Sequence, residues 1–222
     1  MEIWTEMLSN SAPMVVVVCG GPSPDPKSVE FVPVDALVIA VDSGLDNARD
    51  LGLRPIMVIG DLDSISPSGL DWARKQSIEI KEFPKDKDRS DLELALSEAS
   101  NLGDSVFIIG SDSGRFDQTF GNIALMGSES FAFLKCHGLI GSAYITLIRE
   151  REAIQRSNGD VVSIFCLGGS ASGVTIRGFH WELTNDKLPS GSTLGLSNVL
   201  KEEEGMISVT DGVLVAIQPE AI

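Results

Sequence analysis

Short, unbroken apolar stretches rich in Val and Ile recur through the first half of the chain, with polar segments between them. They stand at residues 14–19, 36–41, 56–60 and 105–110. Stretches of this length and composition are typical of strands covered on both faces, as in a parallel sheet. The segments between and after them predict helices at Leu45–Leu51, Gly69–Lys75, Ser90–Asn101 and Arg115–Met126. This alternation indicates an α/β N-terminal domain with a mostly parallel, Rossmann-like sheet.

After about Lys135 the pattern changes to short strand-like stretches separated by Gly, Ser, Asn and Asp. The stretches are "SAYITLIRE", "DVVSIFCL", "GVTIRGFHWEL", "MISVTD" and "VLVAIQ". No long helical period occurs among them, which favours a small all-β sandwich. We therefore expect two domains, residues 1–135 and residues 136–222, in close contact because no long linker separates them.

Composition and charge narrow the function. The 222 residues include 43% hydrophobic and 22% charged residues, which is ordinary for a globular protein. The formal net charge of -15 is not ordinary. It argues against a nucleic-acid or anionic-membrane partner, because phosphate groups attract an excess of Lys and Arg. A nucleotide ligand stays compatible with this charge if a divalent cation lies between the acids and the phosphates.

The cysteines, the histidines and the N-terminal sequence argue against several further kinds of protein and of metal site. The three cysteines are far apart and form no CxxC pair, which argues against a disulfide framework and a cysteine zinc site. Two histidines, His137 and His180, give little support to a histidine metal site. The N-terminus carries glutamates where a signal peptide would carry Lys or Arg, and the apolar stretch at 14–19 is too short to span a membrane. We expect a cytoplasmic protein.

Acidic residues and glycines follow the predicted strands, where ligands bind in open α/β sheets. Asp42 follows the second strand, Asp61 and Asp63 follow the third, and the fourth leads to "SDSGRFDQ". The stretch "KDKDRSDLE" then interleaves acids with Lys85, Lys87 and Arg89 ahead of a helix. Carboxylates and substrate phosphates suit Mg²⁺, while basic side chains suit phosphate oxygens.

Each of these features also has a structural explanation. Asp42 is a candidate helix N-cap, and Ser90 with Glu93 fits a capping box. Arg115 is a candidate phosphate clamp or half of a surface ion pair. Two adjacent carboxylates in "GDLDS" exceed the needs of one cap, which favours a functional role.

Two alternative chemistries fit the sequence less well. A phosphatase nucleophile of the haloacid-dehalogenase type requires Thr or Val at position 65, where this chain has Ile65. The chain contains no Walker A pattern, so an ordinary P-loop kinase is not supported.

Taken together, these motifs resemble those of the thiamine pyrophosphokinase (thiamin diphosphokinase) family. The family patterns are approximately D-G-G, G-D-x-D-S, D-x-T-D, G-G-R-x-D-H/Q and a C-terminal S-N. Here they read Asp42-Ser43-Gly44, Gly60-Asp61-Leu62-Asp63-Ser64, Asp88-Arg89-Ser90-Asp91, Ser113-Gly114-Arg115-Phe116-Asp117-Gln118 and Ser197-Asn198. The five motifs occur in the family order across about residues 15–217.

The resemblance implies a homodimeric enzyme with its site between subunits, built from an α/β nucleotide-binding domain and a thiamine-binding β-sandwich. It implies transfer of a pyrophosphoryl group from ATP to the hydroxyl of thiamine, giving AMP and thiamine diphosphate. Mg²⁺ would be bound by Asp42, Asp61, Asp63 and Asp91. Of these, Asp61, Asp63 and Asp91 would also be catalytic. The nucleotide would contact Asp42, Asp88, Ser90, Arg115, Asp117 and Gln118. Thiamine would contact Ser197 and Asn198.

Three departures from the family patterns bear on the substrate. Ser43 replaces the first Gly of D-G-G, Ser90 replaces Thr, and Val199 and Leu200 stand where an aromatic residue is frequent. Trp181 is an alternative stacking surface, although a lone Trp in a strand is more often part of a core. A pyrophosphokinase for another hydroxymethylated heterocycle, such as a pterin, and a non-catalytic nucleotide- or thiamine-binding module remain as alternatives.

Overall fold

The computed structural model describes residues 12–112 and 114–222. The chain forms two compact units. The first comprises the chain up to Gly21 together with Val29–Phe107, and the second comprises Pro22–Ser28 and Ile108–Ile222. The expected division between residues 135 and 136 stays a prediction. Ser113 of the fourth motif and the first eleven residues lie outside the described part.

Parallel strands form the centre of the first unit, and successive strands are neighbours in the order β4-β3-β2-β1. They are β1 (Val15–Val18), β2 (Leu37–Val41), β3 (Met57–Gly60) and β4 (Glu79–Glu82). β1 and β3 are buried throughout, and β2 is buried except at its first residue, as their apolar sequences predict. β4, "EIKE", lies at the edge and has one apolar residue, Ile80.

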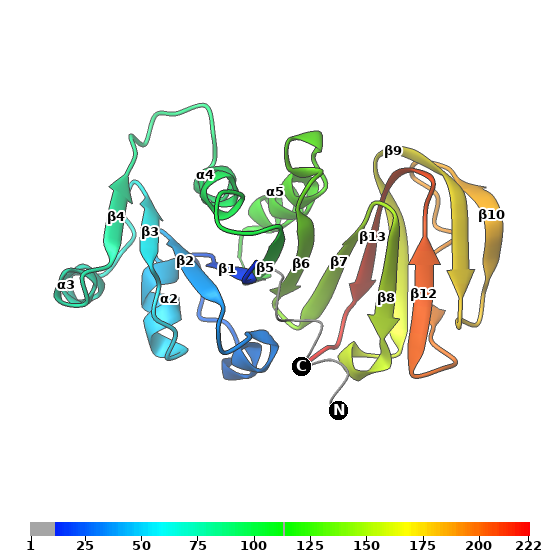
Figure 1. Ribbon diagram of the computed structural model, residues 1–222, viewed down its shortest axis with the longest axis horizontal. Helices are drawn as coiled ribbons and strands as arrows, with labels where there is room; N and C mark the ends of the chain where they lie inside the picture. Colours follow the sequence, from blue (N-terminus) through cyan, green and yellow to red (C-terminus); the bar gives the residue numbers. More distant parts are fainter. Residues whose placement is uncertain (1–11, 113) are drawn as a thin grey trace. The chain divides into compact units, whose positions relative to one another are not determined.

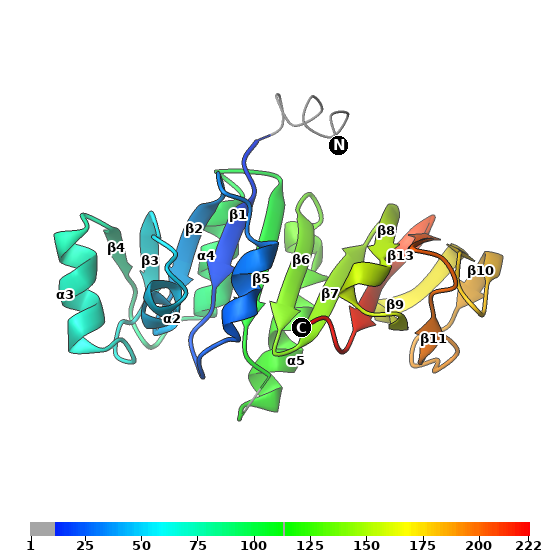
Figure 2. The same ribbon diagram turned by 90° about the horizontal axis from the view of Figure 1, so that it is seen from below.

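Helices lie on both faces of these strands, with α2 and α3 on one side and α4 on the other (Figure 1). Their bounds are α2 (Gly44–Asp50), α3 (Pro67–Lys75) and α4 (Asp91–Ala99). A 3-10 helix, η2 (Pro26–Phe31), precedes β2. Leu45, Ala73 and Ile78 pack with Val58 in a buried cluster that joins this helical layer to the sheet. Figure 2 shows β1 to β4 side by side.

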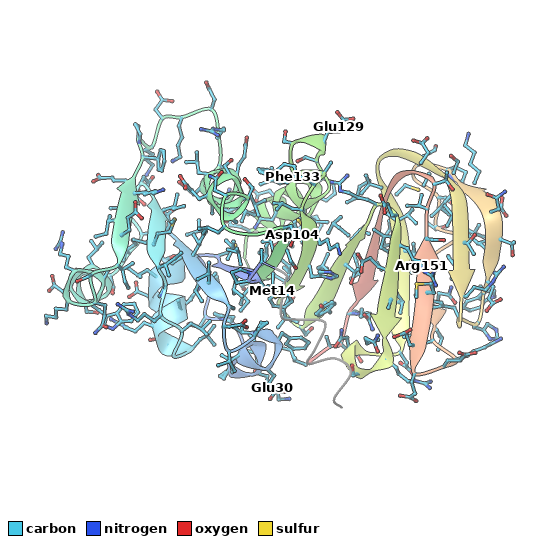
Figure 3. All side chains as sticks on the ribbon, in the orientation of Figure 1. Met14, Glu30, Asp104, Glu129, Phe133 and Arg151 are labelled. Atoms are coloured by element: carbon cyan, nitrogen blue, oxygen red, sulfur yellow. The ribbon has the colours of Figure 1, made fainter. Side chains whose placement is uncertain are left out.

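The second unit consists mainly of antiparallel strands. β5 (Ser105–Gly110) begins in the first unit and ends in the second, and α5 (Phe116–Met126) and η3 (Glu129–Phe131) follow it. The remaining elements are β6 (Lys135–Ile140), β7 (Ala143–Ile148), β8 (Arg151–Gln155), η4 (Arg156–Asn158), β9 (Val161–Arg177), β10 (Leu183–Leu188), β11 (Asn198–Val199), β12 (Glu204–Ser208) and β13 (Asp211–Gln218). Figure 3 shows side chains on these elements, including Arg151 at the start of β8.

The long strand β9 pairs with different strands along its length. Its first part pairs with β13, and its last part pairs with β10 and β12. Gly168 and Gly173 have positive φ angles of 74° and 66°, which allow the strand to change direction. Val162, Ile176 and Phe179 lie in the buried core between these strands.

The sequence-based elements are confirmed where the signal was an apolar run. Strands β1, β2, β3 and β5 and helices α2 to α5 all occur within two residues of the predicted bounds. The N-terminal part therefore has mostly parallel strands, and antiparallel strands follow. Strands β4, β6, β8, β10 and β11 were missed. The stretch 173–183 ends β9 and begins β10 instead of forming one strand. Among the described residues, no helix has the length and apolar character needed to cross a membrane.

Candidate active site

Asp42 is placed by a tight turn directly after β2. Its backbone has a φ of 47°, which is uncommon for a residue with a side chain. The carboxylate lies against Gly60, the last residue of β3, where any Cβ would overlap the Asp42 side chain. Glycine at position 60 is therefore needed for Asp42 to lie against the end of β3.

The turn after β3 holds the adjacent acids of "GDLDS". Leu62 has a φ of 63°, and its backbone N–H donates to Asp42 Oδ1 over 3.3 Å. The Asp63 N–H donates to Asp61 Oδ1 over 3.1 Å. Ile65 is buried in the core of the first unit. The position at which the phosphatase pattern requires Thr or Val thus has a packing role here.

Asp91 comes to the same place from the start of α4. The pKa of Asp42 is raised to about 6, first by burial and then by the nearby carboxyl group of Asp91, with a smaller effect from Asp61. Asp91 Oδ1 is buried, and the ammonium group of Lys87 lies beside it. Negative charge is thus concentrated at Asp42, Asp61 and Asp91, and a cation would relieve it.

Two lysines from the segment between β4 and α4 contact the acids. Lys85 Nζ donates to Asp63 Oδ2 over 2.6 Å, and this hydrogen bond is the main reason that the pKa of Asp63 is lowered. Lys87 Nζ lies 3.0 Å from Asp91 Oδ1. The segment between β4 and α4 therefore gives one lysine to Asp63 in the turn after β3 and one to Asp91 at the start of α4.

The structure brings the predicted metal ligands near one another without assembling them. Asp42, Asp61 and Asp91 interact electrostatically, whereas Asp63 is directed to Lys85. Among residues 12–112 and 114–222, no group of three His, Cys, Asp or Glu side chains forms a ready metal-ligand set. Ser90 caps α4, because its Oγ accepts the Glu93 N–H over 3.2 Å. Asp88 is exposed to solvent.

Ser43, the departure from D-G-G, has a definite role in the first unit. Its Oγ accepts the Gly21 N–H over 3.3 Å, and its own N–H donates to Ser64 Oγ over 3.2 Å. Asn47 is buried and donates to the carbonyl oxygens of Cys19 and Gly21. These bonds tie the segment after β1 to α2 and to the turn after β3.

The fourth motif lies in the second unit, at the start of α5. Arg115 makes a two-pronged contact with Asp117, with Nε 2.9 Å from Oδ1 and Nη2 2.7 Å from Oδ2. The guanidinium lowers the pKa of Asp117 to about 2. Both side chains are largely exposed, as is Gln118. Of the two explanations left open by the sequence, the ion pair is present, and its exposed position leaves Arg115 accessible to a phosphate.

The C-terminal S-N motif holds a tryptophan. Asn198 is buried, its Oδ1 accepts the Trp181 N–H over 3.0 Å, and its Nδ2 donates to the Trp181 carbonyl over 2.8 Å. Ser197 has a φ of 55° and donates its N–H to Ser163 Oγ. The Trp181 side chain is 57% exposed and contacts the His180 ring edge-on at 4.5 Å. The Trp181 backbone is therefore held by Asn198, and its ring lies at the surface and not in the core.

Trp181 and Asn198 line a pocket of about 450 Å³ in the second unit. Its other lining residues are Ile176, Glu182, Leu183, Leu188, Thr193, Leu194, Gly195 and Leu196. A pocket of this size, mostly apolar with a few polar groups, is typical of small-molecule sites. One carboxylate, Glu182, is present and also accepts the Gly178 N–H over 2.9 Å.

Several of these residues were missed from the sequence. Asn47 carries no motif, and only its burial and its bonds to the segment after β1 reveal its role. Glu182, Leu194 and Leu196 stand in the stretch "GFHWELTNDKLPSGSTLGLSN", whose Gly and Ser content gave no sign of a pocket. The one signal available from the sequence was an aromatic residue next to an acid, Trp181 and Glu182 in "HWE".

Comparison with known families decides the relationship. The catalytic-domain model of thiamin pyrophosphokinase matches residues 31–136, and the vitamin B1 binding domain model of the same enzyme matches residues 146–214. Together they cover most of the chain in the expected order. The chain belongs to the thiamin pyrophosphokinase family. The family inferred from the five motifs is thereby confirmed.

Individual thiamin pyrophosphokinases agree with this assignment. Thiamine pyrophosphokinase from Bacillus subtilis (strain 168) is 29% identical over 206 residues, which cover 91% of this chain and 96% of the relative. The crystal structure of thiamine pyrophosphokinase from Bacillus subtilis superposes with a TM-score of 0.83 at 27% identity, covering 94% of this chain and 100% of the other. Thiamine pyrophosphokinase 3 from Oryza sativa subsp. japonica is 26% identical over 171 residues, 71% of this chain and 62% of the relative.

Proposed function

We propose that this protein is a thiamine diphosphokinase that transfers the pyrophosphoryl group of ATP to the hydroxyl of thiamine, with Mg²⁺ as the metal. The hydroxyl oxygen forms a bond to the β-phosphorus of ATP, the bond between that phosphorus and the α-phosphate oxygen breaks, and AMP leaves. The observation that carries this proposal is the match of a catalytic-domain and a vitamin B1 binding-domain model in succession.

The acids of the first unit suit a hard divalent cation. Asp42, Asp61 and Asp91 concentrate carboxylate charge, and Asp91 Oδ1 is buried beside the ammonium group of Lys87. Carboxylate oxygens are the ligands that Mg²⁺ takes alongside water and phosphates. We assign Asp42, Asp61, Asp63 and Asp91 to the metal. When bound, Mg²⁺ would neutralise phosphate charge and align the reacting groups.

The remaining acids and bases would position the reactants. Asp61, Asp63 and Asp91 would orient the triphosphate and the thiamine hydroxyl, and one of these carboxylates would accept the hydroxyl proton. Asp88, Ser90, Arg115, Asp117 and Gln118 would contact the nucleotide. The exposed guanidinium of Arg115 is suited to a phosphate, because it can exchange Asp117 for another pair of oxygens.

The pocket of the second unit is suited to thiamine. Its walls are apolar, the Trp181 ring offers a flat face for an aromatic ring, and Glu182 supplies a negative charge for the cationic thiazolium. Asn198 would contribute by holding Trp181, in addition to the substrate contact that we infer for the Ser197-Asn198 motif.

We extend the proposal to assembly, location and fold detail. The protein would act as a homodimer with each site between two subunits, and it would work in the cytoplasm. We further propose that its parallel sheet binds ATP in the Rossmann-like manner and that the antiparallel strands form a β-sandwich. Support comes from the family resemblance and from the strand arrangement of each unit.

The deciding experiment is incubation with ATP, MgCl₂ and thiamine, with chromatographic detection of nucleotides and thiamine esters. We expect AMP and thiamine diphosphate in equal amounts, and no product from Asp63→Asn with an unchanged circular dichroism spectrum. Formation of ADP would contradict pyrophosphoryl transfer. AMP produced with a hydroxymethyl pterin but not with thiamine would assign the enzyme to the other acceptor.

A further inference from the structure

We propose that Lys85 is an exchangeable counterion of the metal site, which holds Asp63 until the metal and the nucleotide bind and then moves to the phosphate oxygens. The inference rests on the proposed function, because it concerns how the same acids receive their metal. It assigns Lys85 a positioning role that acts through Asp63.

The contact between Lys85 and Asp63 uses an oxygen that we assign to the metal. Lys85 Nζ lies 2.6 Å from Asp63 Oδ2 and donates a hydrogen bond to it. A divalent cation that takes Oδ2 as a ligand must displace this ammonium group, because the two positive charges cannot share one oxygen at bonding distance. Lys85 and the metal therefore compete for Asp63.

The exposure of the pair makes the exchange easy. The Lys85 side chain is 80% exposed and that of Asp63 is 54% exposed. An exposed Lys–Asp pair is worth little free energy, and the four-carbon side chain can swing to a new partner without disturbing the core. The triphosphate of ATP carries several negative oxygens and is the stronger partner for an ammonium group at this position.

Lys87 provides the contrast within the same segment. Its side chain is 15% exposed, and it lies beside the half-buried Asp91 at 3.0 Å. Lys87 also donates to the Pro84 carbonyl over 3.0 Å, which fixes its ammonium group. Of the two lysines, only Lys85 has the freedom to leave its carboxylate.

Because Lys85 competes with the metal for Asp63 and is attracted to phosphate, it couples metal binding to nucleotide binding. The metal alone binds less tightly than the four carboxylates would allow, because it must displace Lys85. With nucleotide present, Lys85 gains a phosphate partner and the penalty disappears. Metal and nucleotide therefore favour each other's binding, and by thermodynamic linkage the coupling is reciprocal.

The first test measures binding of Mn²⁺ alone to the full-length protein, by the electron paramagnetic resonance signal of the free ion. Mn²⁺ shares the preference of Mg²⁺ for carboxylate oxygens. We expect Lys85→Met to bind Mn²⁺ about two- to five-fold more tightly than wild type, the range of an exposed ion pair. The control is Lys81→Met, which removes the same charge from a lysine that pairs with Glu98 over 2.8 Å. Equal affinity in wild type and Lys85→Met, or the same gain in Lys81→Met, would overturn the proposal.

The second test measures α,β-methylene-ATP, whose methylene bridge replaces the oxygen that the reaction would cleave. With Mn²⁺ present, we expect the analogue to bind Lys85→Met about two- to five-fold more weakly than wild type, while Lys81→Met is unchanged. Unchanged affinity in Lys85→Met would contradict the transfer of Lys85 to phosphate. Neither measurement uses thiamine or turnover. Failure of the proposed function would instead appear as absence of AMP from the wild-type enzyme.

Discussion

Gly60 is the residue on which the arrangement of the acids depends most directly. Its φ of 153° and the Asp42 carboxylate beside it leave no room for a side chain. We expect Gly60→Ala to lower the free energy of unfolding by about 1–3 kcal/mol and to weaken Mn²⁺ binding, because the new methyl group displaces Asp42. Urea unfolding and a Mn²⁺ titration measure the two effects.

A matched control for Gly60 is Gly52. Gly52 has a φ of 73°, and a Cβ there would meet no atom within 4 Å. Gly52→Ala introduces backbone strain without a steric overlap, so it should reduce stability and leave Mn²⁺ affinity at the wild-type value. Loss of metal binding in both variants would show that general destabilisation, and not the position of Asp42, is responsible.

Substitutions of the single residue Trp181 test the thiamine end of the proposed site. Replacing Trp181 with Leu removes the aromatic face and keeps an apolar wall, whereas Phe keeps a smaller aromatic face. We expect KM for thiamine to rise about two- to ten-fold in Trp181→Leu, because stacking contributes about 0.5–1.5 kcal/mol beyond apolar burial, and to rise less in Trp181→Phe. Steady-state kinetics at saturating ATP measure this, and KM for ATP should not change. A larger rise in KM for ATP than for thiamine would place Trp181 at the nucleotide.

The positions of residues at the ends of strands explain which parts of the candidate site could be predicted from the sequence. Asp42, Asp61 and Asp63 were predicted to lie close together because parallel strands end at one edge of a sheet, and their positions after β2 and β3 follow that rule. The partner of Lys85 was not predictable, because it depends on how the segment between β4 and α4 folds back over 22 residues of separation. The two Asn198 bonds to Trp181 likewise join residues whose proximity only the tertiary fold creates.

At the scale of elements, the adjacent strands β6 and β7 cover most of a histidine side chain. His137 pairs in register with Thr146 of β7, its ring lies 6.2 Å from that of Tyr144, and its Nδ1 is buried with no hydrogen bond to the described residues. Burial, with a smaller effect from Lys135 on the same strand, lowers the pKa of His137 to about 4. The folded protein therefore keeps this imidazole neutral at pH 7.

The lowered pKa predicts a pH dependence of stability. Between about pH 6.5 and pH 4 the unfolded chain binds a proton at His137 and the folded chain does not. Above about pH 6.5, His137 is neutral in both the folded and the unfolded chain, and it does not change the free energy of unfolding with pH. Below that pH, the free energy of unfolding falls by about 1.4 kcal/mol per pH unit. We expect His137→Phe to lose stability less steeply between pH 6.5 and 4.5 in urea titrations. Parallel curves for wild type and variant would contradict the neutral buried state.

The element scale also shows where sequence patterns stop being informative. Uniform apolar stretches identified β1, β2, β3 and β5, because both faces of these strands are covered. The edge strand β4 has mostly polar residues, and β10 carries "LTNDKL", which has almost no strand composition. Both strands form because a neighbouring strand presents free backbone groups to them, which is a tertiary cause that local composition does not record.

At the scale of the whole molecule, the acidic net charge has to be reconciled with binding of the polyanion ATP. A chain with a net charge of -15 repels ATP at long range. In the first unit, Lys85 and Lys87 place positive charge beside Asp63 and Asp91, and the proposed metal would add to it. Local positive charge among acids therefore allows an acidic protein to bind a polyanion without a basic surface.

The proposed homodimer gives the whole-molecule prediction. If the acids of one subunit and the pocket of its partner form one site, two different inactive variants can complement each other. Asp63→Asn would inactivate the metal end, and Trp181→Ala with Asn198→Ala would inactivate the thiamine end. Random reassociation makes about half of the dimers mixed, and each mixed dimer holds one intact site and one doubly defective site.

We therefore expect the mixture to recover about a quarter of wild-type activity after the two variants are unfolded and refolded together, whereas each variant refolded alone stays inactive. The assay measures AMP release at a thiamine concentration near the wild-type KM, where a weakened thiamine end leaves little activity. The control mixes Asp63→Asn with Asp61→Asn, which are defective at the same end and cannot complement. Recovery in the control, or no recovery in the test mixture while light scattering shows dimers, would mean that each site is built within one subunit.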